Sequence, residues 1–224
     1  MRIKLAAFLV TISFAAGAQT SRPIEFSLAA GVKRNIFENV KKDIMAFNTT
    51  PNYDQSLITP LVKNSYSFFT SLKSSKQVNN RFAITNTAGL DMQQLNIESG
   101  FKRVAAVPGV VGYSKEYSST LIPRLKIDFG VRYDLVQGRN TTLQVGLAGG
   151  QMIRLSEAGS SYSFVEANFS VQSKNIVWFA SGSLSPYNVT LPGFQNYFGN
   201  LGADVIGAYE YRIYDIDLGI AIKL

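Results

Sequence analysis

The residue types that most often carry out chemistry in proteins are missing from this chain or lack the partners they need. Its 224 residues include no histidine and no cysteine. Histidine is the commonest general base near neutral pH, and the usual zinc sites are built from cysteine and histidine. Serines are frequent, but a serine hydroxyl is a weak nucleophile without a base beside it. The composition therefore argues against histidine-dependent hydrolases and acyltransferases and against zinc sites of the usual type.

Two other patterns resemble functional sites, and each has a simpler structural explanation. Asp215 and Asp217 lie on one face of a predicted strand, as an acid–base pair would, but ion pairing inside a fold accounts for them better. The glycine-rich run 146–150 falls within an alternating strand, whereas a phosphate-binding loop must lie between a strand and a helix. We expect that run to let the strand bend or pack closely. The sequence thus predicts no catalytic, cofactor-binding or metal site, and we expect no enzyme.

The charge pattern excludes one class of partner. Lysine and arginine number 22 against 15 acidic residues, which gives a formal net charge of +7, but the excess is spread thinly along the chain. A nucleic-acid-binding arm would concentrate its lysines and arginines in a run or on one face. We therefore expect no nucleic-acid partner.

The first residues have the three parts of a secretory signal peptide. Arg2 and Lys4 give a positive start, residues 5–16 are apolar, and the small residues at 16–18 match the pattern cut by signal peptidase. The apolar run is too short for a transmembrane helix, which needs about 20 residues. We expect residues 1–18 to be removed after export and residues 19–224 to form one domain.

Hydropathy in the rest of the chain alternates with a period of two, which predicts β-strands. In residues 125–135 every odd position is apolar and every even position is charged or glycine. The last eleven residues repeat this design from Tyr214 to Leu224. Segments 143–155 and 203–213 also alternate, and weaker alternation is found in segments 24–33, 66–72, 81–90, 95–103, 162–171 and 176–184.

Short polar turns at 137–140, 156–160 and 173–175 predict antiparallel hairpins between successive strands. We expect an all-β, antiparallel up-and-down barrel of ten strands, with eight strands as the alternative. Two segments interrupt the alternation. Residues 34–63 predict a long loop, either irregular or containing a short amphipathic helix, and residues 185–200 predict a second loop rich in proline and aromatic residues.

The distribution of small residues decides which face of the strands points inward. Many glycines and alanines share the face that carries the charges, for example Gly31, Gly130, Gly150 and Gly219. A solvated face has no need of small residues, whereas the interior of a narrow barrel is crowded. Charges of both signs on that face can pair inside a barrel, which offsets the cost of burying them. The sequence therefore predicts a transmembrane barrel, with apolar side chains outward and polar side chains inward.

The signal peptide, the alternating strands and the terminal pattern Tyr214-x-Ile216-x-Leu218-x-Ile220-x-Ile222-x-Leu224 resemble small bacterial outer-membrane β-barrel proteins. In that class the last strand often ends in phenylalanine, and here it ends in Leu224. The resemblance implies a Gram-negative cell outer membrane, contact with outer-membrane lipid and lipopolysaccharide, and contact with other envelope proteins.

Three functions remain open at this point. The first is a non-enzymatic structural or interaction protein that acts through its loops, with 34–63 as the segment that contacts a partner. The second is a small porin-like pore for ions or solutes. The third is a soluble, secreted lipocalin-like carrier, which would require an apolar interior and a polar outer face.

Overall fold

The computed structural model of the chain describes residues 23–41, 44–48, 55–104, 111–156, 160–190, 203–206 and 210–224. The predicted signal peptide lies outside these ranges. The strands within them are β1 (Ile24–Lys41), β2 (Ile44–Asn48), β3 (Gln55–Lys63), β4 (Ser65–Gln77), β5 (Phe82–Val104), β6 (Val111–Gln137), β7 (Thr141–Arg154), β8 (Tyr162–Ser173), β9 (Ile176–Leu184), β10 (Val189–Thr190), β11 (Ala203–Ile206) and β12 (Glu210–Lys223). Among the described residues, no helix has the length and apolarity needed to cross a membrane.

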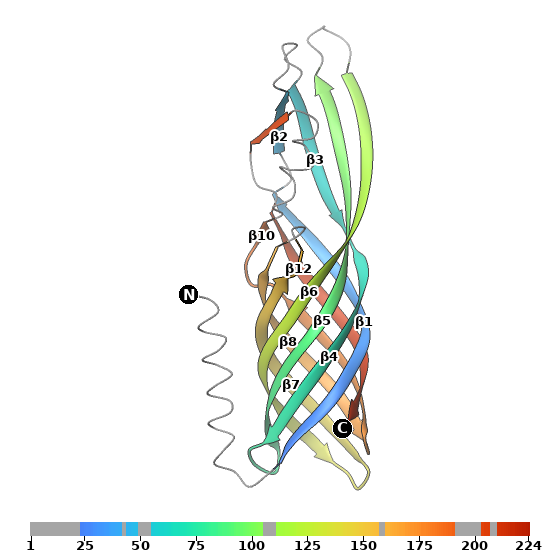
Figure 1. Cartoon of the computed structure of the whole chain (residues 1–224), viewed down its shortest axis with the longest axis vertical. Coiled ribbons are helices and arrows are strands. Elements are labelled where there is room, and N and C mark those ends of the chain that lie inside the picture. The colour runs from blue at the N-terminus through green and yellow to red at the C-terminus, as the bar shows by residue number, and fades with distance from the viewer. Residues whose placement is uncertain are drawn as a thin grey trace.

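Eight of these strands close into an antiparallel barrel (Figure 1). Around the barrel the order is β1, β4, β5, β6, β7, β8, β9 and β12, and β12 pairs back with β1. The expected all-β, up-and-down architecture is confirmed. The barrel has the eight strands of the alternative count, so the expectation of ten was too high.

The sequence-based count of barrel strands was too high in two places. Segments 81–90 and 95–103 belong to the single strand β5, which continues through the polar residues between them. Segment 203–213 contains β11, which pairs with β2 outside the closed barrel.

The two ends of the barrel differ. At one end, here called the short-turn end, lie the turns at 78–81, 138–140 and 174–175, the start of β1 and the end of β12 (Figure 1). Leu224 N donates to Phe26 O over 2.9 Å at this end. The opposite end, here called the long-loop end, carries all the longer connections between barrel strands.

The sheet continues beyond the barrel at the long-loop end (Figure 1). β5 and β6 remain paired to Val104 and Val111, well past the last β6–β7 pair at Arg124. β3 adds to the far edge of β5, β2 adds to β3, and β11 adds to β2. We call this assembly of β6, β5, β3, β2 and β11 the projecting sheet.

The projecting sheet changes the interpretation of residues 34–63, which the sequence predicted as a loop with an optional helix. β1 continues to Lys41, and β2 and β3 occupy residues 44–48 and 55–63. The apolar residues spaced three or four apart in this segment therefore belong to strands, because each strand finds a neighbour with which to pair. The segment is still an excursion from the barrel, between the barrel strands β1 and β4.

Polarity across the barrel wall is inverted relative to a water-soluble barrel. Arg124, Lys33 and Asp215 have 0 to 2% of their surface exposed, whereas Leu147 is 65% exposed and Trp178 is 59% exposed. The exposed apolar side chains are spread over all eight barrel strands and include Leu28, Phe68, Leu90, Val131, Leu147, Phe169, Trp178 and Leu218. An apolar outer wall and a charged interior are the arrangement of a transmembrane β-barrel.

This polarity predicts that an exposed position in the middle of the wall tolerates no charge. Replacing Leu147 with arginine should lower the free energy of unfolding from lipid bilayers by about 2–4 kcal/mol, because the arginine side chain would have to enter hydrocarbon. The same replacement at Val136, which is 59% exposed beside the short turn at 138–140, should cost only about 0–1 kcal/mol. Urea titration of folding into vesicles measures both values, and equal small effects at the two positions would contradict a lipid-facing wall.

Candidate functional site: the barrel interior

In the interior of the barrel, glycines lie opposite large aromatic side chains and leave room for them. Any side chain at Gly31 would collide with Leu218 O and with the ring of Phe69, and one at Gly219 would meet the ring of Phe179. Gly150 similarly leaves room for the Phe164 ring. These glycines confirm the crowded interior that the sequence predicted.

Lys33 is the centre of a buried charge cluster within the barrel. It pairs with Asp91 from β5, and its Nζ lies 3.8 Å from Asp215 Oδ2 and 4.0 Å from Asp217 Oδ1 on β12. All four side chains are at most 5% exposed. One lysine thus ties together strands β1, β5 and β12 and pairs with all three carboxylates.

Next to this cluster, β4, β6 and β8 contribute a second group of charges. Lys126 pairs with Glu166 and lies 3.6 Å from Asp128 Oδ2. Lys73 Nζ lies 3.9 Å from the centroid of the Phe179 ring, which is cation–π distance. Charges of opposite sign therefore alternate around the interior, as the cost of burying them requires.

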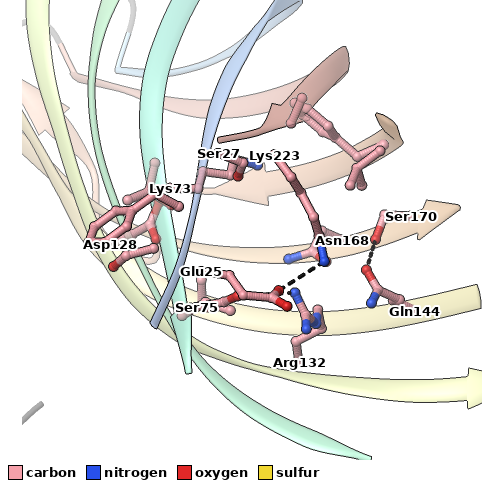
Figure 2. Close-up of a pocket in the computed structure, with 18 of the residues that line it drawn as sticks. Glu25, Ser27, Lys73, Ser75, Asp128, Arg132, Gln144, Asn168, Ser170 and Lys223 are labelled. Carbon is pink, nitrogen blue, oxygen red and sulfur yellow. Dashed lines mark hydrogen bonds and ion pairs between the residues drawn. The ribbon is translucent and has the colours of Figure 1, made fainter. Parts of the chain in front are cut away.

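A cavity lies between these charges and the short-turn end. Its walls include Glu25, Arg132 and Lys223, and Figure 2 shows side chains from strands on both sides pointing into it. The free space for water-sized molecules is about 90 Å³. A single water needs roughly 10–15 Å³ measured in this way, so the cavity has room for a few waters and not for a larger solute.

At the long-loop end, an apolar layer fills the barrel. Phe37 and Tyr211 meet edge to face with ring centroids 5.6 Å apart, and Arg124 lies over the ring of Tyr162 at 4.8 Å. The other buried members of this layer come from β3, β5, β6, β7, β8, β10 and β12: Val62, Leu95, Ile122, Met152, Phe164, Val189 and Ile213. The described interior is thus occupied by charge pairs in the middle and by this layer at the long-loop end, and the cavity lies near the short-turn end.

The predicted inward face is correct for most of its charged residues. Lys33, Lys126, Asp128, Glu166 and Asp217 all lie inside the barrel, as does the carboxylate pair of which Asp217 is a member. That pair has an ion-pairing environment through Lys33, as the sequence analysis favoured.

Three charged residues that the sequence placed on the inward face point outward instead. Glu98 pairs with Lys63 on the outer surface at 2.8 Å, and the exposed Arg212 donates to Asn188 Oδ1 at 3.1 Å, next to Glu210. Tyr211 and Ile213 occupy the inside there, in the apolar layer. At these positions the apolar residues of the strand point inward and the charged residues point outward. They lie beyond the apolar part of the wall, where the outer face needs no apolar side chains.

The sequence analysis missed three charged residues of the interior: Asp91, Arg124 and Lys73. Arg124 has the same parity as Lys126 and Asp128, but Pro123 obscured the continuation of that strand toward the long-loop end. Asp91 lies in the stretch that separates the two segments predicted as different strands. Reading β5 as one strand would have placed it inside.

No cluster of three or more potential metal-ligating side chains occurs among the residues that the structure describes. Comparison with protein families finds no family model that matches, and no curated protein sequence matches either.

Solved structures give weak likenesses. Neisserial surface protein A is 9% identical, with 89% of this chain and 97% of that one covered, at a TM-score of 0.37. The outer membrane protease OmpT from Escherichia coli is 8% identical, with 90% and 96% covered, at a TM-score of 0.40. Likenesses at this level do not assign a function.

The class of the protein follows from its own geometry. A closed barrel of eight antiparallel strands satisfies its backbone groups internally, and its outer wall is apolar while its interior is charged. This chain has the fold of a small outer-membrane β-barrel protein. The polar interior and apolar exterior are the opposite of what a lipocalin-like carrier requires.

Lys33 provides a direct test of the interior charge network. Replacing it with methionine leaves Asp91, Asp215 and Asp217 buried without their lysine, and we expect a loss of about 3–5 kcal/mol in the free energy of unfolding. The matched control is Lys63→Met, which breaks an ion pair whose lysine is 47% exposed and should cost only about 0–1 kcal/mol. Urea unfolding in bilayers gives both free energies. Similar losses for the two variants would mean that Asp91, Asp215 and Asp217 do not need Lys33 for charge compensation.

Proposed function

We propose that this protein is a non-enzymatic interaction protein of the bacterial outer membrane, in which the barrel is the anchor and the projecting sheet contacts a partner. The observation that carries the proposal is the length of β5 and β6. They span 23 and 27 residues, whereas a transmembrane strand needs roughly 9–11. Both strands therefore extend beyond the membrane.

The geometry of the projecting sheet supports binding of a macromolecule. β6 pairs with β5 from Val111 onward, but its pairing with β7 begins only at Arg124. Among the described residues, β6 therefore has one unpaired edge from 111 to 122. An open edge of this kind offers backbone donors and acceptors to an extended segment of another chain.

The interior supports an anchor more than it supports a pore. Buried ion pairs and the apolar layer fill the described part of the barrel, and the cavity near the short-turn end holds only a few waters. An eight-stranded barrel is just wide enough for its own side chains to fill. We propose that other envelope proteins are the partners, while outer-membrane lipid and lipopolysaccharide surround the wall.

Photo-crosslinking in living cells tests the proposed contact surface. A photoreactive amino acid at Tyr117, which is 72% exposed where β6 leaves the barrel, should give a discrete adduct with a protein partner. The same amino acid at the lipid-facing position Leu147 should give no protein adduct. Protein adducts at both positions, or at neither, would contradict partner binding by the projecting sheet.

Planar-bilayer recording tests the pore alternative. We expect no regular conductance steps from the wild-type protein, because the apolar layer seals the interior at the long-loop end. Steps of uniform size that persist after repeated purification would reject the anchor and establish a channel.

A further inference from the structure

The outer surface at the short-turn end carries three cations close to the edge of the apolar wall. Lys76 lies at the end of β4, Arg81 in the turn at 78–81, and Arg139 in the turn at 138–140. Lys76 has the outward parity of β4, since Ser71, Ser67 and Ser65 on the opposite parity are buried. We call Lys76, Arg81 and Arg139 the basic rim patch.

The two turns of the patch are fixed side by side. Asp134 N donates to Arg81 O over 2.9 Å, and Gln137 Nε2 donates to Asn80 O over 2.6 Å. Gly138 N closes its own turn by donating to Thr141 O. These bonds hold the turn at 78–81 against the end of β6, so the backbone that carries Arg81 and Arg139 forms one surface at the short-turn end.

No acidic side chain in the described parts of β4, β5 and β6 faces outward near the patch, and Glu25 on the neighbouring strand β1 is paired with Lys223 at 2.9 Å. In the described segments 74–86 and 130–141 the only acid is Asp134, which is 6% exposed. Asp134 lies 3.6 Å from Arg132 and accepts hydrogen bonds from Gln137 and Gln144 on the inside of the barrel. The charge of the basic rim patch is therefore not neutralised from within.

An aromatic pair joins the patch to the apolar wall. The rings of Phe82 and Tyr133 lie with centroids 4.8 Å apart, and Arg81 Nη1 donates to Tyr133 Oη at 3.1 Å. A hollow in the surface at this place is lined by Val78, Asn79, Asn80, Arg81, Phe82 and Tyr133. Phe82 is 47% exposed, so the hollow has an apolar side toward the membrane and a guanidinium toward the water.

We propose that the basic rim patch and this hollow bind the phosphate headgroup of an anionic glycerophospholipid in the leaflet at the short-turn end. Continuity with the exposed apolar wall favours a lipid over a soluble acidic partner, because glycerol and acyl chains can lie against Phe82 and Tyr133 while the phosphate meets Arg81. A guanidinium presents donors that match phosphate oxygens in pairs. Tyr133 acts as a positioning residue, since its hydroxyl holds Arg81 over the hollow.

The test compares binding of phosphatidylglycerol and phosphatidylcholine with identical acyl chains to the full-length protein, folded in detergent, by native mass spectrometry. Each cation near an anionic lipid surface contributes about fivefold in affinity, so we expect wild type to prefer phosphatidylglycerol by on the order of tenfold or more. The triple variant Lys76→Gln, Arg81→Gln, Arg139→Gln should lose this preference. Tyr133→Phe keeps all three charges and should lose part of it.

The control is Arg34→Gln, which removes an exposed cation from β1 at the other end of the apolar wall, where Arg34 pairs with Ile216 and Tyr66. This variant should keep the full preference, and the heat-dependent gel mobility of a folded barrel should be unchanged in every variant. The proposal is overturned if wild type binds both lipids equally, if the triple variant still prefers phosphatidylglycerol, or if Arg34→Gln loses as much as the triple variant. None of these outcomes bears on partner binding by the projecting sheet, which lies at the opposite end.

Discussion

Hydrocarbon offers no hydrogen-bond partner to a backbone N–H or C=O group, so every such group in the wall of this protein must be satisfied by a neighbouring strand. Closure of β1 onto β12 meets that requirement, because it removes the two edges that an open eight-stranded sheet would have. In the part of the chain that the structure describes, β6 has an open edge beyond the barrel, in the projecting sheet. The same constraint thus divides the molecule into a closed wall and an open extension.

Closing only eight strands leaves a narrow interior, and this determines what can lie inside it. Aromatic rings fill the space that glycines leave open, as at Gly31 and Gly150. Most buried charges are compensated by ion pairs, with Lys33 and Lys126 each pairing with more than one carboxylate, while Arg124 and Lys73 lie over the aromatic rings of Tyr162 and Phe179. A filled interior in turn leaves the ends of the barrel as the places where other molecules can bind.

The sequence was most informative where the membrane imposes one rule on a whole strand. Residues 125–135 alternate between apolar side chains and positions that are charged or glycine, and the structure places them as predicted. The pattern fails beyond the membrane, because both faces of a strand can then be polar or apolar. Tyr211 turns inward for that reason, and β2 and β3 were mistaken for a loop. Pairing between distant segments, such as β3 with β5, leaves no local signal in hydropathy.

The outward orientation of the apolar face is the central claim, and the chain contains its own probe for it. Trp178 is the single tryptophan, lies on β9 and is 59% exposed on the barrel wall. With the protein folded into vesicles, lipids brominated on their acyl chains should quench most of the Trp178 fluorescence, while iodide in the water should quench little of it. Strong quenching by iodide with none from the brominated lipids would mean that the wall faces water, and the assignment of inside and outside would be reversed.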